Sequence, residues 1–247
     1  MNIPALTDRQ IQILKYIIEE YISSGEAVGS DTLDRKHNLG VSPATIRNEM
    51  VALAQQGYLE QLHTSSGRVP TPQSLRFYIT QLMEEKDLTV GEEVDMKSKL
   101  WDFREEVDRL LREATRLLAQ KSRGIAVAST QKGTIYHSGY ANILDIPEFF
   151  DIDVTRTVLS LIDNESDLQI FFQKAGGHNE PVHIMLGDDF ESEHLYPCGF
   201  VHTTFDFGLY GEGNLGVIGP SRLDYPYIIP MIRYFGKLLD EIAEKWR

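Results

Sequence analysis

The stretch from Gly40 to Thr71, GVSPATIRNEMVALAQQGYLEQLHTSSGRVPT, constrains the fold more than any other part of the chain. Ser42 is a typical N-cap and Pro43 suits the first helical position, so a helix is predicted to begin there and to end at Gly57. The segments YLEQL and RVP are predicted to be short strands on either side of the polar turn HTSSG. This part of the chain therefore encodes a helix followed at once by a small hairpin.

Two more helices are predicted ahead of this unit. The first has Thr7 as N-cap, Gln10 to complete a capping box and Gly25 as a stop. The second begins at Ser30 and ends in the turn before Gly40. Three helices followed by a hairpin are typical of a winged helix-turn-helix, although similar bundles also bind only protein.

The third helix has one apolar face, formed by Ile46, Met50 and Leu53. The N-terminal turn of its other side carries the polar residues Ser42, Thr45, Arg47 and Asn48. Arginine can bind guanine or phosphate, asparagine can pair with adenine, and hydroxyl groups reach phosphate oxygens. We therefore predict that this side contacts DNA bases, and that Arg68 in the hairpin contacts the DNA backbone.

The overall charge of −13 is unusual for a DNA-binding protein. Residues 1–85 contain seven Lys and Arg against ten Asp and Glu, a net charge of −3, which leaves −10 for residues 86–247. Affinity for DNA depends on cations gathered on one face more than on the total charge. The charge therefore does not exclude a local DNA-binding surface.

A long helix is predicted from Glu92 to about Gln120. Its apolar residues alternate at spacings of four and three, and they are Met96, Leu100, Phe103, Val107, Leu110, Ala114 and Leu117. This seam can pack on the rest of the chain or pair with a second copy. For dimerisation the residues of interest are Leu100, Phe103, Val107, Leu110 and Leu117.

The remaining sequence is mixed. GIAVAST, DLQIFFQ, PVHIMLGD, GFVHTTFDFG and NLGVIGP are predicted strands, and VTRTVLSLID is a predicted helix. A last helix should start after Asp224, with Pro230 either kinking it or delaying its start. We therefore predict an α+β fold with an antiparallel sheet, in which residues 1–85 bind DNA, 86–121 connect, and 122–247 form the second domain.

No set of residues indicates catalysis, a cofactor or a metal site. Cys198 is the only cysteine, and His178, His183 and His194 lack the spacing of metal ligands. No apolar run is long enough for a membrane helix, and the N-terminus does not look like a secretory signal, so a cytoplasmic protein without membrane contact is expected. We expect neither an enzyme nor a bound cofactor.

Four segments carry a resemblance to a known family. They are VGSDTLDRKHNLGVSPATIRNEMVALAQQGYLEQLHTSSGRVPT, SLRFYITQLM, GYANILDIPEFFD and GNLGVIGPSRLDYPYIIPMIRYFGKLLDEI. Together they resemble HrcA, the bacterial heat-inducible transcription repressor family. The resemblance implies a homodimeric winged-helix repressor of chaperone genes, with a GAF-like second domain, an inverted-repeat operator in double-stranded DNA, and support from a GroEL-type chaperonin.

The resemblance also assigns site residues. The DNA-contacting helix of the family falls on residues 42–56 and its wing on residues 59–69, so the roles pass to Ser42, Thr45, Arg47, Asn48 and Arg68. Family members are typically longer and carry an inserted dimerisation segment, which is missing here near Gln131 to Gly133. An inverted repeat still requires two recognition helices, so the 92–120 helix is the expected replacement interface.

Two other functions remain open. GAF-like folds often hold a small molecule, so a metabolite-responsive winged-helix regulator is the main alternative. An enzyme with an appended DNA-binding domain is the third.

Overall fold

The computed structural model describes residues 6–61, 67–175 and 181–244. The chain divides into two compact units, Met1–Glu84 and Glu85–Arg247. Residues 86–121, expected as a connecting segment, pack within the second unit. Each unit is considered by itself.

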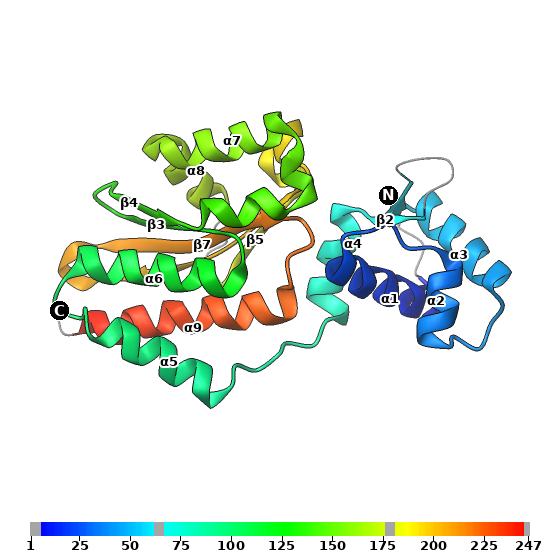
Figure 1. Ribbon diagram of the computed structural model, residues 1–247, viewed down its shortest axis with the longest axis horizontal. Coiled ribbons are helices and arrows are strands. Elements are labelled where there is room, and N and C mark those ends of the chain that lie inside the picture. The colour runs from blue at the N-terminus through cyan, green and yellow to red at the C-terminus, as the bar shows by residue number, and fades with distance from the viewer. Residues whose placement is uncertain (1–5, 62–66, 176–180, 245–247) are drawn as a thin grey trace. The chain divides into compact units, whose positions relative to one another are not determined.

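The first unit contains three helices, a short hairpin and a further helix (Figure 1). In order these are α1 (Asp8–Ser24), α2 (Ser30–His37), α3 (Pro43–Gln55), β1 (Leu59–Glu60), β2 (Val69–Pro70), α4 (Pro72–Phe77) and the π-helical turn η1 (Tyr78–Leu82). The core of this unit includes Ile13, Leu14, Ile17, Ile18, Leu33, Ile46, Met50, Leu53 and Leu75. The predicted element order and apolar faces of these three helices are therefore confirmed.

Local signals in the sequence set the ends of these helices. Thr7 Oγ1 accepts a hydrogen bond from the Gln10 amide (3.3 Å), and Gln10 Oε1 accepts one from the Thr7 amide (3.1 Å), which completes the predicted capping box. Gly25 ends α1 in the left-handed conformation, with φ 71°. Gly57, with φ 81°, follows α3 in the same way.

The second unit is built on a five-stranded antiparallel sheet in the order β4-β3-β7-β6-β5. Its strands are β3 (Ile125–Thr130), β4 (Ile135–Ser138), β5 (His183–Leu186), β6 (Cys198–Asp206) and β7 (Glu212–Pro220). Its α-helices are α5 (Val90–Trp101), α6 (Val107–Ser122), α7 (Ile152–Asp163), α8 (Glu165–Ala175) and α9 (Tyr225–Ala243). Short 3-10 helices are η2 (Tyr140–Asp145), η3 (Pro147–Phe150), η4 (Gly187–Phe190), η5 (Glu193–Leu195) and η6 (Gly208–Tyr210).

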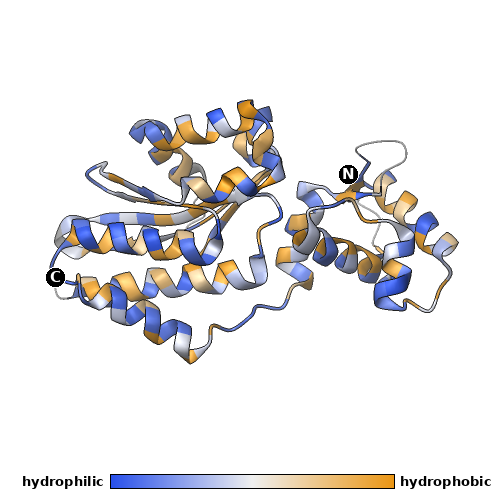
Figure 2. Cartoon of the chain, in the orientation of Figure 1, coloured by the Kyte–Doolittle hydropathy of each residue, from blue (hydrophilic) through white to orange (hydrophobic). Residues whose placement is uncertain are grey.

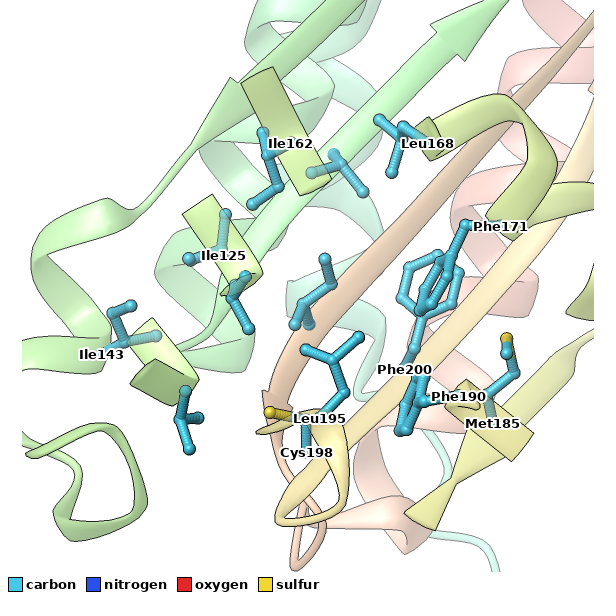
Figure 3. Close-up of a cluster of buried hydrophobic side chains, with 14 of the residues drawn as sticks. Ile125, Ile143, Ile162, Leu168, Phe171, Met185, Phe190, Leu195, Cys198 and Phe200 are labelled. Atoms are coloured by element: carbon cyan, nitrogen blue, oxygen red, sulfur yellow. The ribbon is translucent and has the colours of Figure 1, made fainter. Parts of the chain in front are cut away.

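Helices cover both faces of this sheet. In Figure 1, α6 and α9 lie along one face, and α7 and α8 lie on the other. In Figure 2 these helices carry alternating hydrophobic and hydrophilic bands, as expected for helices with one buried side. The cluster on the α7 and α8 side joins residues from helices and strands (Figure 3), and within it Phe171 stacks on Phe190 with ring centroids 5.4 Å apart. The predicted α+β class with an antiparallel sheet is confirmed.

The predicted continuous helix from Glu92 to Gln120 is wrong. Helix α5 ends at Trp101 and α6 begins at Val107. At the break, Arg104 Nη1 donates to the Trp101 carbonyl at 2.8 Å, and its guanidinium lies 5.6 Å from the centre of the indole ring. This arginine satisfies a carbonyl that a continuing helix would have used.

The proposed dimerisation seam lies largely inside the second unit. Leu100, Leu110 and Leu117 are buried, whereas Phe103 and Val107 are half-buried. Helix α6 packs on β3 and β4, so its leucines serve the core of this unit. The burial of these residues favours the alternative in which the seam covers the sheet of its own unit.

Two further predictions are resolved near the end of the chain. The prediction that DLQIFFQ is a strand is wrong, because this segment lies in α8. Asn164 precedes this helix, and its side-chain oxygen accepts hydrogen bonds from the amides of Ser166 and Asp167. The last helix, α9, begins at Tyr225 and contains Pro230. Pro230 therefore lies within the helix and does not delay its start.

Candidate nucleic-acid interface

Helix α3 has one buried face and one exposed face. Ile46, Met50 and Leu53 pack into the core of the first unit. The exposed stripe consists of Ala44, Arg47, Asn48, Val51 and Gln55. These residues are three or four positions apart, so they form a continuous surface along the helix.

Arg47 and Asn48 lie at the centre of this stripe. Both are exposed, and within residues 6–61, 67–175 and 181–244 neither side chain forms a hydrogen bond or an ion pair. Their side-chain donors are therefore available to an external partner. The helix that carries them is anchored by its buried face, which limits the conformational entropy lost on binding.

Ser42 and Thr45 have a different place. Ser42 Oγ accepts a hydrogen bond from the Thr45 amide at 3.2 Å, and the two hydroxyl groups lie 3.0 Å apart. Ser42 is exposed and Thr45 is half-buried. These residues form the N-terminal cap of α3, beside the stripe that carries Arg47 and Asn48.

The acidic residue of α3 is directed to another helix. Glu49 Oε2 accepts a hydrogen bond from Gln10 Nε2 at 3.1 Å, and its other oxygen lies 3.5 Å from Arg9. This arrangement ties α3 to the start of α1. The nearby Arg9 also compensates the negative charge of Glu49, which would otherwise repel a polyanion near Asn48.

Helix α2 is fixed to α1 by a small polar cluster. Glu20 pairs with Lys36, and Glu20 Oε1 lies 3.1 Å from His37 Nε2. The His37 ring stacks on Tyr16 with centroids 4.1 Å apart. The hydrogen bond from Lys36 holds the pKa of Glu20 below its ordinary value. Because α2 packs against α3, this cluster helps to position the exposed stripe.

The hairpin is joined to the segment between α1 and α2. Val28 and Arg68 exchange backbone hydrogen bonds of 2.9 Å in both directions, and this isolated bridge ties the segment at Val28 to the hairpin of β1 and β2. Arg68 is half-buried and lies next to β2. The predicted wing therefore has its base fixed at Arg68, whereas its turn, residues 62–66, lies outside the described residues.

Gly67 is required for this close approach. A Cβ atom at this position would lie 2.5 Å from the carbonyl carbon and oxygen of Val28. We expect Gly67→Ala to weaken the pairing of Val28 with Arg68 and to cost about 1–3 kcal/mol of local stability. Hydrogen exchange should show faster exchange of the Val28 and Arg68 amides. Gly91→Ala is the control, because no atom lies closer than 4.0 Å to its Cβ position; equal protection in both variants would contradict this role.

Sequence reasoning missed three parts of this surface. Ala44 and Val51 lie in the exposed stripe, and Val51 is 39% exposed although it is apolar. Small apolar side chains can contact the methyl group of thymine. Helical spacing from Asn48 could have indicated both residues, but the contact of Gly67 with Val28 depends on the tertiary structure.

The second unit has a surface cleft of about 430 Å³. Its lining residues are Glu106, Val107, Asp108, Thr130, Lys132, Thr134, Tyr136 and Tyr210. The hydroxyl of Tyr136 donates to Asp108, and the Arg112 guanidinium lies 5.7 Å from the centre of its ring. Burial, reinforced by this hydrogen bond, raises the pKa of Tyr136, so its hydroxyl remains a donor at neutral pH.

Two other kinds of site are absent from the described part of the chain. No group of three or more His, Cys, Asp or Glu residues there could hold a metal ion. In the same residues, no helix is both long and apolar enough to cross a membrane.

Comparison with known proteins identifies the chain's relatives. The family model described as HrcA protein C terminal domain matches residues 50–229. A protein of Desulforudis audaxviator named heat-inducible transcription repressor HrcA is 25% identical, with 97% of this chain and 98% of the relative covered. A protein of the same name from Symbiobacterium thermophilum is 27% identical, with 96% and 98% covered.

A solved structure has the same fold. It is described as the crystal structure of a hypothetical protein, and it has a TM-score of 0.78 at 18% identity, covering 98% of this chain and 100% of the other. The alignment with the Desulforudis relative extends over 339 residues, whereas this chain has 247, so at least 92 positions have no counterpart here. The family model over residues 50–229 agrees with the relatives, which match nearly the whole chain, and the chain therefore belongs to the HrcA family of heat-inducible transcription repressors, proteins that are not enzymes.

Proposed function

We propose that the first unit is a winged helix-turn-helix that binds operator DNA with α3 in the major groove. The observation that supports this most directly is the exposure of Arg47 and Asn48, without partners among the described residues, on a helix anchored by its opposite face. Arginine can donate to both O6 and N7 of guanine, and asparagine can pair with N6 and N7 of adenine. The two residues would therefore read bases.

The neighbouring residues would complete the interface. Ala44 and Val51 extend the stripe in both directions and can contact thymine methyl groups. Ser42 and Thr45 lie at the N-terminus of α3, where hydroxyl and amide groups commonly bind phosphate. Arg68, at the base of the hairpin, would contact the DNA backbone beside the groove.

The complete repressor would act as a homodimer on an inverted repeat upstream of chaperone genes. An inverted repeat matches the two-fold symmetry of a dimer, and it requires recognition helices separated by about 34–36 Å or a multiple of that distance. Heat would release the protein from DNA. The GAF-like second domain would carry the response to stress, as the family resemblance implies.

The experiment is a fluorescence-anisotropy titration of a duplex from the region upstream of the organism's own chaperone genes. We expect binding to this duplex to be at least 1,000-fold tighter than to a scrambled duplex at physiological salt. Equal affinity for both duplexes would contradict sequence-specific repression.

Arg68→Ala should weaken binding to all DNA sequences by a similar factor, because a phosphate contact carries no base information. The slope of log affinity against log salt should decrease by about 1. A titration over several salt concentrations measures both effects. The matched control is Arg156→Ala, which removes the same charge from the exposed surface of α7. A loss of base preference in Arg68→Ala would instead place this arginine on the bases.

The resemblance adds a protein partner. Purified GroEL-type chaperonin should increase operator binding, and unfolded client protein should reverse the increase by competing for the chaperonin. Titration of the protein–DNA mixture with chaperonin and nucleotide measures this effect. Unchanged operator binding would exclude chaperonin control for this chain.

The cleft in the second unit supports a second candidate function, a metabolite-responsive regulator. Its volume of about 430 Å³ lies in the range of small-molecule sites, and Asp108, Lys132 and two tyrosines offer both charges and aromatic surface. A thermal-shift screen of zwitterionic metabolites tests it. A compound that stabilises the protein and releases it from the operator would favour this function, and Asp108→Asn should abolish that effect.

A further inference from the structure

Helix α5 has an apolar stripe that lies outside its buried face. Met96 and Leu100 are fully buried within the second unit. Val90 is 77% exposed and Val94 is 60% exposed, and no other large hydrophobic side chain in the described residues is as exposed as Val90. Exposed valines in adjacent turns of one helix form a contiguous patch, which is a common sign of an interaction surface.

The stripe continues to the end of the helix. Trp101 is half-buried and lies on the same side as the two valines, since positions 90, 94 and 101 are separated by four and seven residues. The Lys97 and Arg104 cations lie 5.9 and 5.6 Å from the centre of the Trp101 ring. Between the large residues, exposed Gly91 and Ser98 leave room for another backbone.

We propose that this stripe is the dimer contact and that a second copy of α5 packs on it in the antiparallel direction. The inference rests on the proposed function, which requires two copies on an inverted repeat. The α5 stripe would also provide a dimer contact in a chain that lacks at least 92 positions of its relative. Helix α5 starts soon after the boundary between the units at Glu84, so it can hold two DNA-binding units together.

The charges on both sides of the stripe determine the direction. On one side lie Asp95 and Lys99, which form an ion pair of 2.8 Å, and on the other side lie Glu93 and Lys97, whose ammonium also pairs with Glu241 of α9 at 2.9 Å. Each side therefore has its acid N-terminal to its lysine. In an antiparallel pair, each side of α5 faces the same side of the partner helix, which runs in the opposite direction. The acidic residue of one copy therefore faces the lysine of the other.

A parallel pair has the opposite electrostatic result. In a parallel pair, the side of α5 with Asp95 and Lys99 faces the side of the partner with Glu93 and Lys97. Acid then faces acid, and lysine faces lysine. Like charges at this spacing are destabilising. The antiparallel arrangement also places Val90 of each copy against Trp101 of the other, because these residues lie at opposite ends of the helix.

The contact is small. Helix α5 has 12 residues and is about 18 Å long, so a pair of such helices lies at the lower end of interface sizes. We therefore expect a dimer that dissociates at micromolar concentrations of the full chain. Binding of both DNA-reading units to one operator would then strengthen the dimer through their high local concentration.

Val94→Glu in the full chain tests the contact. Sedimentation should show dimerisation weakened at least tenfold, while circular dichroism remains that of the wild type because the side chain is 60% exposed. Ile170→Glu is the matched control, since this isoleucine of α8 is 51% exposed and lies outside the stripe. An unchanged dimer in Val94→Glu would overturn the proposal.

DNA binding separates this inference from the proposed function. Val94→Glu should bind a single half-site as the wild type does and lose at least tenfold affinity for the inverted repeat. If the wild type bound no half-site, the proposed function would fail. If Val94→Glu bound the inverted repeat normally, only the α5 contact would fail.

Cysteine cross-linking tests the direction. In an antiparallel pair the two Val90 positions lie about 16 Å apart, which is too far for a disulfide. Val90→Cys alone should therefore not cross-link, whereas a mixture of Val90→Cys and Trp101→Cys should. Cross-linking of Val90→Cys to itself would show a parallel pair, and no cross-link in either sample would place the contact elsewhere. The native Cys198 is buried, so it should not contribute.

Discussion

Replacing Arg47 and Asn48 with alanine together should reduce affinity for the operator by about 30-fold or more. Each residue, if it pairs with a base, contributes about 1–3 kcal/mol of specific binding. Both are exposed on the stripe of α3, and neither side chain contributes to a hydrogen bond or ion pair within the described part of the chain. Their removal should therefore leave the fold unchanged and reduce the preference for operator over scrambled DNA.

The measurement is a competition titration against operator and scrambled duplexes, with circular dichroism to confirm folding. The single variants should each relax the preference at different base pairs. Arg156→Ala is again the control for lost charge, because it belongs to the second unit. Retention of the full preference by the double variant would exclude α3 as the base-reading element.

The second large effect concerns a buried histidine. His202 on β6 has no exposed surface, and in the described structure neither ring nitrogen has a hydrogen-bond partner. Its ring is surrounded by Phe172, Phe200 and His183, with centroids 5.0–5.2 Å away. Burial, and then the proximity of His183, lowers the pKa of His202 to about 3.

This pKa predicts a loss of stability in acid. In the unfolded chain His202 takes up a proton below its ordinary pKa of about 6.5, whereas in the folded chain it stays neutral down to about pH 3. Its contribution is therefore complete above pH 6.5 and is lost as the pH falls toward 3. For one proton the free energy of unfolding should decrease by about 1.4 kcal/mol per pH unit in this window.

His202→Leu isolates the effect. The variant should be about 1–3 kcal/mol more stable at neutral pH, because it removes buried polar atoms without partners. Its stability should also fall less steeply between pH 6 and 4. Urea denaturation followed by tryptophan fluorescence reports on the second unit, since the sequence of the first unit contains no tryptophan and Trp101 lies in α5. The exposed His194→Gln is the control, and parallel pH curves for His202→Leu and wild type would contradict the prediction.

Local signals explain why the first unit could be predicted. The capping box of Thr7 and Gln10 and the Ser42 cap before Pro43 are formed by neighbouring residues. Spacing also identified the buried face of α3. Such features depend on a few consecutive positions, so the sequence alone was sufficient for them.

The errors in the second unit have tertiary causes. The break after Trp101 contains neither glycine nor proline. It depends on Arg104 reaching the Trp101 carbonyl and on α6 packing on β3 and β4 while α5 packs on α6 and α9. In α8, Leu168, Ile170 and Phe172 alternate like a strand, although the helix buries Leu168, Phe171 and Phe172 instead. The cap at Asn164 was a local signal that could have corrected this.

The candidate site shows the same division. Arg47 and Asn48 were placed correctly on the outer side of α3 by spacing, whereas Thr45 is engaged in the cap. The contact of Gly67 with the Val28 backbone joins residues far apart in sequence. Only the folded chain shows that Gly67 determines how closely the hairpin approaches the backbone of Val28.

The most direct test of this account is footprinting of the purified full chain on the DNA upstream of the organism's chaperone genes. The account predicts two protected half-sites in inverted orientation, with centres separated by about 10–10.5 base pairs or a multiple. Protection should disappear in the Arg47→Ala, Asn48→Ala double variant and persist in Arg156→Ala. Cleavage without any protected half-site, at all protein concentrations below the onset of non-specific binding, would contradict it.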